Sequence, residues 1–179
     1  MRLFVAVDLP EGAAALVAAL PRPALPAVHW TTPEQWHVTV RFLGEVDPAQ
    51  LGGPSGLCAA LDGVPSALRH GGAGPVGAVL GPAVAWFPGR HVLQVPVRGL
   101  EALARAVAAA SASWGDPPER DFRGHLTLAR TRRRASGPPS LAGAPIVAHW
   151  LVPELVLYES TLGPGASRYR ALHRVALPG

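Results

Sequence analysis

The tetrapeptide His-apolar-Thr-apolar occurs twice in the chain, as residues 37–40 and again as residues 125–128. Each copy lies in a run rich in β-branched or aliphatic residues, which favours a strand. Residues two apart in a strand point to the same face, so the His and Thr of each copy share a polar face and the apolar pair packs on the other. If the two halves of the chain face each other about a pseudo-twofold axis, two imidazoles and two hydroxyls converge on one cleft. Chance could also produce two copies, because Thr and aliphatic residues are common in strands.

Composition limits the class of protein. The 179 residues are 49% hydrophobic and 16% charged, which is typical of one compact domain spanning residues 1–179. The single cysteine, Cys58, excludes an internal disulfide and a multi-thiolate metal site. No stretch resembles a secretory leader, and Gly or Pro interrupts every apolar run before it reaches the length of a membrane span. We therefore expect a cytoplasmic protein with no membrane association.

The 20 glycines and 20 prolines favour many short elements joined by tight connections. Hydrophobic periodicity predicts helices at 11–20, within 49–61 and at 101–113. It predicts strands at 3–7, 28–31, 36–46, 67–69, 83–87, 91–97, 124–131, 154–160 and 169–177. Helices and strands are interleaved without a regular βαβ alternation, which indicates an α+β fold.

The paired histidines and threonines suit chemistry at phosphorus. In-line displacement needs a base for the attacking oxygen and an acid for the departing one, and two imidazoles with pKa values near 6.5 can serve as neutral base and charged acid. The hydroxyls of Thr39 and Thr127 can donate to the non-bridging oxygens. A metal site is not expected, because no carboxylate accompanies either His-Thr pair.

All 16 cationic side chains are arginine, and the chain has no lysine. Arginine grips phosphate with two parallel hydrogen bonds, so a phosphate-bearing partner is one explanation; a GC-rich genome is the other. Position is more informative than number, because six arginines fall within residues 120–134, beside the second tetrapeptide. This cluster predicts a basic rim that attracts an RNA backbone.

Longer segments around the two tetrapeptides resemble the two-histidine (2H) phosphoesterase superfamily, in its RNA 2′,3′-cyclic phosphodiesterase branch, also called 2′-5′ RNA ligases. The segments that carry the resemblance are Arg2–Pro10, Pro33–Val46, Phe122–Arg130 and Leu157–Ser160. The resemblance implies an α+β, bilobal, pseudo-twofold fold, in which two antiparallel sheets surround a central cleft and the helices lie outside. It also implies hydrolysis of RNA 2′,3′-cyclic phosphate ends to 2′-phosphates without metal or cofactor, with possible 2′-5′ ligation in reverse. We further expect a monomer and possible binding of nucleotides.

Carried over by position, the resemblance makes His37 the general acid on the departing O3′ and His125 the base that activates water. Thr39 and Thr127 would hold the phosphate. Arg130 follows the second motif at the family's basic position, but strict alternation places it opposite His125. Either a bulge or the strand end turns it inward, or it binds RNA outside the pocket.

Arg132 and Arg133 are further candidates for RNA or phosphate contacts. Gly124 stands where many family members have proline, which leaves the RNA contacts of the following loop open. Two alternatives also stay open at this stage: a non-catalytic module that binds nucleotides or RNA ends, and the same chemistry on a small cyclic nucleotide.

Overall fold

The computed structural model describes residues 1–117, 120–132, 135–163 and 167–178. Its helices are α1 (Glu11–Ala18), α2 (Leu57–Asp62), α3 (Val64–His70) and α4 (Glu101–Ala110). Its strands are β1 (Arg2–Asp8), β2 (Val28–Trp30), β3 (His37–Glu45), β4 (Gly77–Leu80), β5 (Ala85–Trp86), β6 (Val92–Arg98), β7 (His125–Thr131), β8 (Ala148–Leu151), β9 (Glu154–Leu162) and β10 (Ser167–Ala176). Single 3-10 turns lie at Pro33–Gln35, Pro48–Gln50 and Pro139–Leu141.

One antiparallel sheet connects these strands in the order β10-β9-β1-β3-β7-β6-β4-β8, with β2 added beside β7 and β5 beside β6. The expectation of an α+β fold is confirmed, but that of two separate sheets is wrong. The two halves join at the centre, where Val38 of β3 pairs with Leu126 of β7. The sheet is strongly curled instead of divided, and the centres of the two tetrapeptides are direct neighbours across it.

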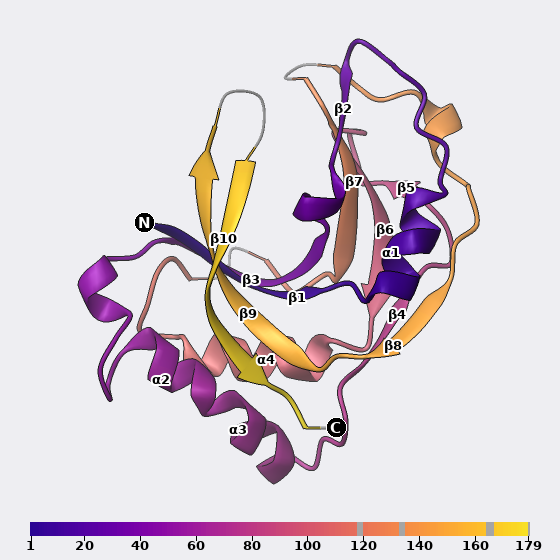
Figure 1. Ribbon diagram of the computed structural model, residues 1–179. Coiled ribbons are helices and arrows are strands. Elements are labelled where there is room, and N and C mark those ends of the chain that lie inside the picture. The colour runs from indigo at the N-terminus through magenta and orange to yellow at the C-terminus, as the bar shows by residue number, and fades with distance from the viewer. Residues whose placement is uncertain (118–119, 133–134, 164–166, 179) are drawn as a thin grey trace.

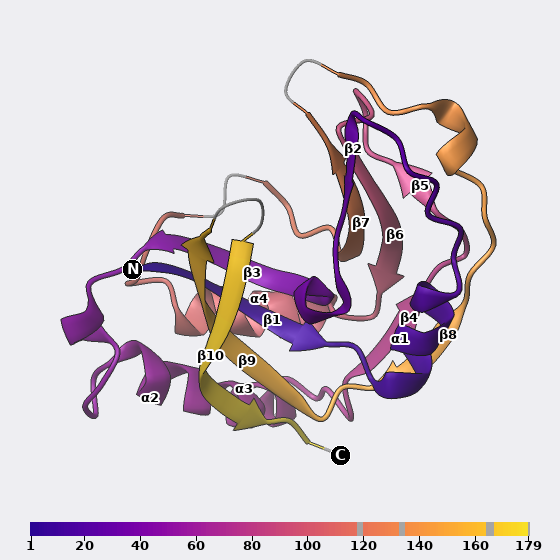
Figure 2. The same ribbon diagram turned by 45° about the horizontal axis from the view of Figure 1, so that its top comes forward.

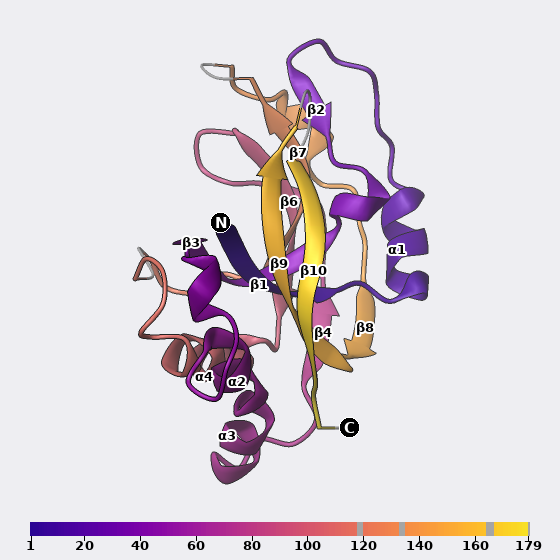
Figure 3. The ribbon, with the colours of Figure 1, turned by 60° about the vertical axis from the view of Figure 1, so that its left-hand side comes forward.

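The helices lie outside the curled sheet (Figure 1). Helices α2, α3 and α4 gather at one end, and α1 lies beside β4 and β8 (Figures 1 and 2). The C-terminal half of β10 contacts α2, where His173 lies 2.7 Å from Asp62, whereas the other end of the β9–β10 hairpin and the β2 end of the sheet point away from α2, α3 and α4 (Figure 3). The helices therefore leave the central polar face of β3 and β7 uncovered.

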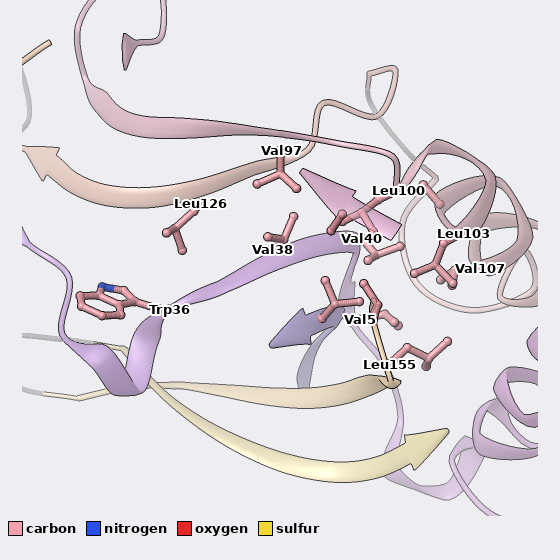
Figure 4. Close-up of a cluster of buried hydrophobic side chains, with 14 of the residues drawn as sticks. Val5, Trp36, Val38, Val40, Val97, Leu100, Leu103, Val107, Leu126 and Leu155 are labelled. Carbon is pink, nitrogen blue, oxygen red and sulfur yellow. The ribbon is translucent and has the colours of Figure 1, made fainter. Parts of the chain in front are cut away.

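The apolar residues of both tetrapeptides enter the hydrophobic core. Val38 and Leu126 are fully buried, and they point into a cluster shared with α4 and the neighbouring strands (Figure 4). In α4, Leu103 and Val107 are one helical turn apart and both fully buried, so the apolar residues whose periodicity predicts this helix face the core. Burying a Leu or Val side chain contributes about 1.5–3 kcal/mol. The core thus holds the two motif strands in place.

Most predicted elements are present, but some bounds and assignments were wrong. The segment predicted as a strand at 67–69 lies in α3, where Val64 and Leu68 are buried at helical spacing. In the 49–61 segment, glycine and proline delay the helix until Leu57. Strands β4 and β8 were not predicted. Each has only four residues and their apolar alternation is short.

Candidate active site

The polar residues of the two tetrapeptides face one cavity of about 400 Å³. Its walls include His37 and Thr39 from β3, and His125 and Thr127 from β7. The four side chains meet because the residues between them, Val38 and Leu126, pair across the centre of the sheet and turn into the core. The structure therefore brings the predicted histidines and threonines together on the shared faces that strand alternation predicts.

A β-bulge in β7 brings Arg130 to the same cavity. Across β6 and β7, Leu93 pairs with Ala129, but Gln94 pairs with Thr127, so Leu128 is an extra residue. Leu128 and Ala129 are consecutive and both buried, and the next side chain, Arg130, lines the cavity with His125 and Thr127. Strict alternation would have placed Arg130 on the opposite face, and the bulge is the physical reason that it does not.

Strand β3 has a bulge at the corresponding place. Val5 of β1 pairs with Arg41, but Ala6 pairs with Thr39, which leaves Val40 as the extra residue. Val40 and Arg41 are both buried, and Phe42 is turned outward, 44% exposed, into the cavity. Phe42 is the fifth residue after His37, as Arg130 is the fifth residue after His125, and a bulge directs each of these side chains to the cavity.

Arg41 serves the fold and not the cavity beside His37. Its guanidinium donates to the Ala108 carbonyl at 2.6 Å, near the end of α4, and to the carbonyls of Trp114 and Asp116 at 3.4 and 3.5 Å. A cation is favourable at a helix C-terminus, where carbonyl groups lack helical partners. The side chain therefore joins β3 to the end of α4 and to the segment that follows it.

Thr31 holds the β7 bulge in shape. Its hydroxyl lies 2.9 Å from the carbonyl oxygens of both Thr127 and Leu128, and its backbone N–H donates to the Leu128 carbonyl at 2.9 Å. The same hydroxyl accepts a hydrogen bond from the Trp36 indole at 3.2 Å. Thr31 also lines the cavity. It therefore positions the part of β7 that presents Thr127 and Arg130.

The backbone orients His125. Its Nδ1 lies 2.8 Å from the Arg123 carbonyl, which can only accept, so Nδ1 carries a proton. In the neutral imidazole, Nε2 is then an acceptor. The His125 ring also contacts Phe87, with the two ring centres 4.9 Å apart and the ring planes nearly perpendicular.

His37 is enclosed by aromatic side chains. The Phe4 and Tyr169 ring centres lie 4.8 and 5.0 Å from the His37 ring centre. On its polar side, His37 Nε2 lies 3.1 Å from the Thr39 hydroxyl. His37 is therefore the more tightly surrounded of the two histidines.

Burial lowers the pKa of both imidazoles. For His37, burial lowers the pKa to about 4. A hydrogen bond to the Gln35 backbone opposes this shift, whereas His125, when it is protonated, and the positive charge of Arg130 add to it. For His125, burial again lowers the pKa, the Arg123 hydrogen bond raises it and Arg130 lowers it. Without a bound anion, both rings are thus neutral at pH 7, and the cavity favours a ligand whose negative charge compensates a protonated imidazole.

Of the two further candidate arginines, the structure describes one. Arg132 donates from Nε to His29 Nε2 at 3.2 Å and is not part of the cavity wall. Arg133 lies outside the described residues. Arg130 is therefore the predicted arginine that the structure places beside the two histidines.

Several residues of the cavity wall were not predicted as site residues. They are Arg2, Phe4, Thr31, Gln35, Phe42, Ser160, Leu162, Ser167 and Tyr169. Most come from β1 and the β9–β10 hairpin, which are distant in sequence from both tetrapeptides. Arg2 lies over the Phe42 ring, with its guanidinium carbon 4.9 Å from the ring centre. The segments containing most of these residues carried the resemblance, but no local motif marked their side chains as parts of one site.

In the described ranges, no three His, Cys, Asp or Glu side chains form a group that could hold a metal ion. The helices of the described chain include none long and apolar enough to cross a membrane.

Comparisons with known proteins point to one family. Residues 3–84 match the family described as LigT-like phosphoesterase. A crystal structure of a Thermus thermophilus protein is 30% identical, with a TM-score of 0.73, and the match covers 100% of this chain and 99% of that one. The apo structure of Escherichia coli LigT is 27% identical, with a TM-score of 0.67 over 99% of this chain and 98% of that one.

A Geobacillus stearothermophilus protein named RNA 2′,3′-cyclic phosphodiesterase is 29% identical over 171 residues, or 89% of this chain. The chain spans 52% of that relative's length. Crystal structures of Escherichia coli LigT also include complexes with 3′-AMP, phosphate, ATP and NADP+. Nucleotides and phosphate are thus ligands of Escherichia coli LigT, and the Geobacillus relative is named for a cyclic phosphodiester substrate.

Proposed function

Because the chain belongs to the LigT-like phosphoesterase family, we propose that it hydrolyses 2′,3′-cyclic phosphate ends of RNA to 2′-phosphates. The observation that carries the proposal is the convergence of two His-Thr pairs and Arg130 on one cavity. In the reaction, a water oxygen bonds to phosphorus and the bond from phosphorus to O3′ breaks. The product has a 2′-phosphate and a free 3′-hydroxyl.

His125 is the base. Its Nδ1 donates to the Arg123 carbonyl, so the neutral ring presents Nε2 as an acceptor for the proton of the attacking water. A positioned base of this kind typically accelerates a reaction by about 10²- to 10⁴-fold.

His37 is the acid that protonates the departing O3′. Its low pKa means that it has to gain a proton when substrate binds. The cyclic phosphate is an anion, and a negative charge beside a buried imidazole raises its pKa. Binding of the substrate thus creates the charged acid that cleavage requires, within the aromatic surroundings of His37.

Thr39 and Thr127 hold the phosphate between the two histidines. Their hydroxyls lie on the same faces as His37 and His125 and can donate to non-bridging oxygens, where negative charge increases in the transition state. Arg130 adds a positive charge on the β7 side of the cavity. These groups supply stabilisation of the phosphate without a metal ion.

The complexes of Escherichia coli LigT with 3′-AMP and ATP favour a second candidate. In it, the same groups hydrolyse a small 2′,3′-cyclic nucleotide instead of an RNA end. A ligation reaction, in which the 5′-hydroxyl of a second RNA attacks phosphorus in place of water, the bond to O3′ breaks and a 2′-5′ linkage results, would use the same acid and base.

The experiment is hydrolysis of a short RNA with a 2′,3′-cyclic phosphate end in excess EDTA. We expect turnover to a 2′-phosphate at the rate measured without EDTA. A parallel assay with a nucleoside 2′,3′-cyclic phosphate separates the two candidates by kcat/KM. Binding of the RNA end without turnover would refute the proposal and indicate a binding module.

A further inference from the structure

A second cavity, of about 820 Å³, shares His125 with the catalytic cavity. Its wall is formed by Phe87, Pro88, His91, Val92, Arg120, Asp121, Arg123 and His125. We call it the β6 compartment, because residues 87–92 lead into β6. His125 lines both this compartment and the catalytic cavity, so the two cavities adjoin at this side chain and one ligand can extend from one into the other. Its volume is in the range of about 300–1,000 Å³ that small-molecule sites have.

The charged lining of the β6 compartment favours an anion. Arg120 and Arg123 are exposed and contribute two permanent positive charges, while Asp121 contributes one negative charge. The remaining titratable side chains in the wall are His91 and His125. Guanidinium groups pair with phosphate through two parallel hydrogen bonds, so this wall suits one phosphodiester better than a neutral ligand.

An aromatic ring forms part of the compartment wall beside His125. Phe87 contacts the His125 ring edge-on, with ring centres 4.9 Å apart, and is only partly buried. The turn that carries it is closed by two backbone hydrogen bonds, from Phe87 to Val92 at 3.0 Å and from Arg90 to Phe87 at 2.9 Å. A fixed, accessible ring beside cationic side chains is the arrangement on which proteins stack single-stranded bases.

We propose that the β6 compartment binds the nucleotide that precedes the cyclic phosphate end of the RNA. Its phosphodiester lies against Arg120 and Arg123, and its base stacks on Phe87. The inference rests on the proposed function, because it extends from the phosphate held between His37 and His125 to the next unit of the same strand. It makes the protein selective for chain ends over free cyclic nucleotides.

The test compares kcat/KM for three substrates: a nucleoside 2′,3′-cyclic phosphate, the same compound with a 5′-phosphate, and a dinucleotide with a 2′,3′-cyclic end. We expect the dinucleotide to exceed the nucleoside about tenfold or more, because stacking of one base contributes about 1–3 kcal/mol. The nucleoside 2′,3′-cyclic phosphate with a 5′-phosphate should show the part of the preference over the plain nucleoside that depends on Arg120 and Arg123.

The double variant Arg120→Gln/Arg123→Gln should reduce the ratio of dinucleotide to nucleoside kcat/KM by about fivefold or more. It should also lower the salt dependence of oligonucleotide binding, by about 0.7 in the log–log slope for each phosphate that the variant no longer neutralises. The matched control is Arg69→Gln/Arg98→Gln, which removes the same charge from two exposed arginines outside both cavities. This control should keep the wild-type ratio and slope.

Asp121→Asn provides a test that does not depend on loss of function. Removing the one carboxylate in the wall should raise the dinucleotide to nucleoside ratio by a few fold, and a folding defect cannot produce this increase. Phe87→Leu should lower the ratio for the dinucleotide but not for the 5′-phosphorylated nucleoside, because only the dinucleotide has a second base.

The inference is wrong if Arg120→Gln/Arg123→Gln changes kcat/KM for all three substrates by the same factor, since the compartment would then bind the terminal nucleotide itself. If no substrate is hydrolysed, the proposed function fails separately. In that case, fluorescence anisotropy of a labelled oligonucleotide with a 2′-phosphate end decides the matter: equal affinities of the wild type and the double variant would overturn the inference, and a weaker double variant would support it.

Discussion

The aromatic enclosure of His37 makes folding stability depend on pH in a measurable way. Burial beside Phe4 and Tyr169 lowers the folded-state pKa of His37 to about 4, whereas an imidazole in an unfolded chain has a pKa near 6.5. The unfolded state therefore binds the proton more readily. The contribution of the neutral His37 ring to the free energy of unfolding is fully present above pH 6.5 and is lost as the pH falls from 6.5 towards 4. The variant His37→Gln removes the titrating group and should remove this loss.

The size of the effect follows from the two pKa values. At pH 5, a shift from 6.5 to about 4 corresponds to a loss of about 2 kcal/mol in the free energy of unfolding, relative to pH 8. The free energy of unfolding of a typical protein is about 5–15 kcal/mol in total, so a loss of this size is detectable. Between pH 8 and pH 5, the free energy of unfolding of His37→Gln should fall by about 2 kcal/mol less than that of the wild type, whatever the stability of the variant at pH 8.

Urea unfolding at pH 8 and pH 5 measures the difference for both proteins, and the comparison cancels the titration of other groups. His149→Gln is the matched control, because this side chain is exposed on β8. It should show the wild-type pH dependence. Equal losses in the wild type and His37→Gln would mean that His37 is not held neutral by its surroundings, and the reasoning about its activation by substrate would fail.

Three further predictions concern the cavity and the bulges. In the productive form of the free protein, one imidazole is positively charged and the other is neutral. Because the pKa values of both imidazoles are lowered, kcat/KM should reach its maximum below pH 6.5. Arg130→Gln should shift the alkaline limb of this profile to higher pH, because Arg130 lowers both pKa values. Thr39→Val and Thr127→Val should each reduce kcat/KM by about 10- to 100-fold, since each removes a hydrogen bond to a charged group; rates within twofold of wild type would exclude a role in holding phosphate. Arg41→Met should lower the free energy of unfolding by about 1–3 kcal/mol in urea titrations, because three carbonyls lose their donor, and unchanged stability would contradict its structural role.

Strand alternation was sufficient to predict which residues of the tetrapeptides share a face. It could not predict the side of Arg130, because one extra residue in β7 reverses the alternation beyond Thr127. A signal was present in the sequence: Leu128 and Ala129 are consecutive apolar residues in a strand that otherwise alternates. In β3 the same signal is hidden, since the second buried residue of the bulge is the charged Arg41.

The joining of the two halves into one sheet was beyond the reach of local patterns. It depends on the pairing of Val38 with Leu126, a contact between residues far apart in sequence. The contribution of the β9–β10 hairpin was missed for the same reason, because Tyr169 meets His37 only after the sheet curls. Local periodicity predicts strands and faces, whereas long-range pairing decides which faces form one cavity.

The most direct test of the central claim is the turnover of an RNA with a 2′,3′-cyclic phosphate end by the wild type, His37→Ala and His125→Ala in the presence of EDTA, with circular dichroism to verify folding. The two-histidine mechanism predicts a 2′-phosphate product from the wild type and a loss of about 10²-fold or more in each variant. A folded variant of either histidine that retains the wild-type rate, or a wild type inactivated by EDTA, would contradict it.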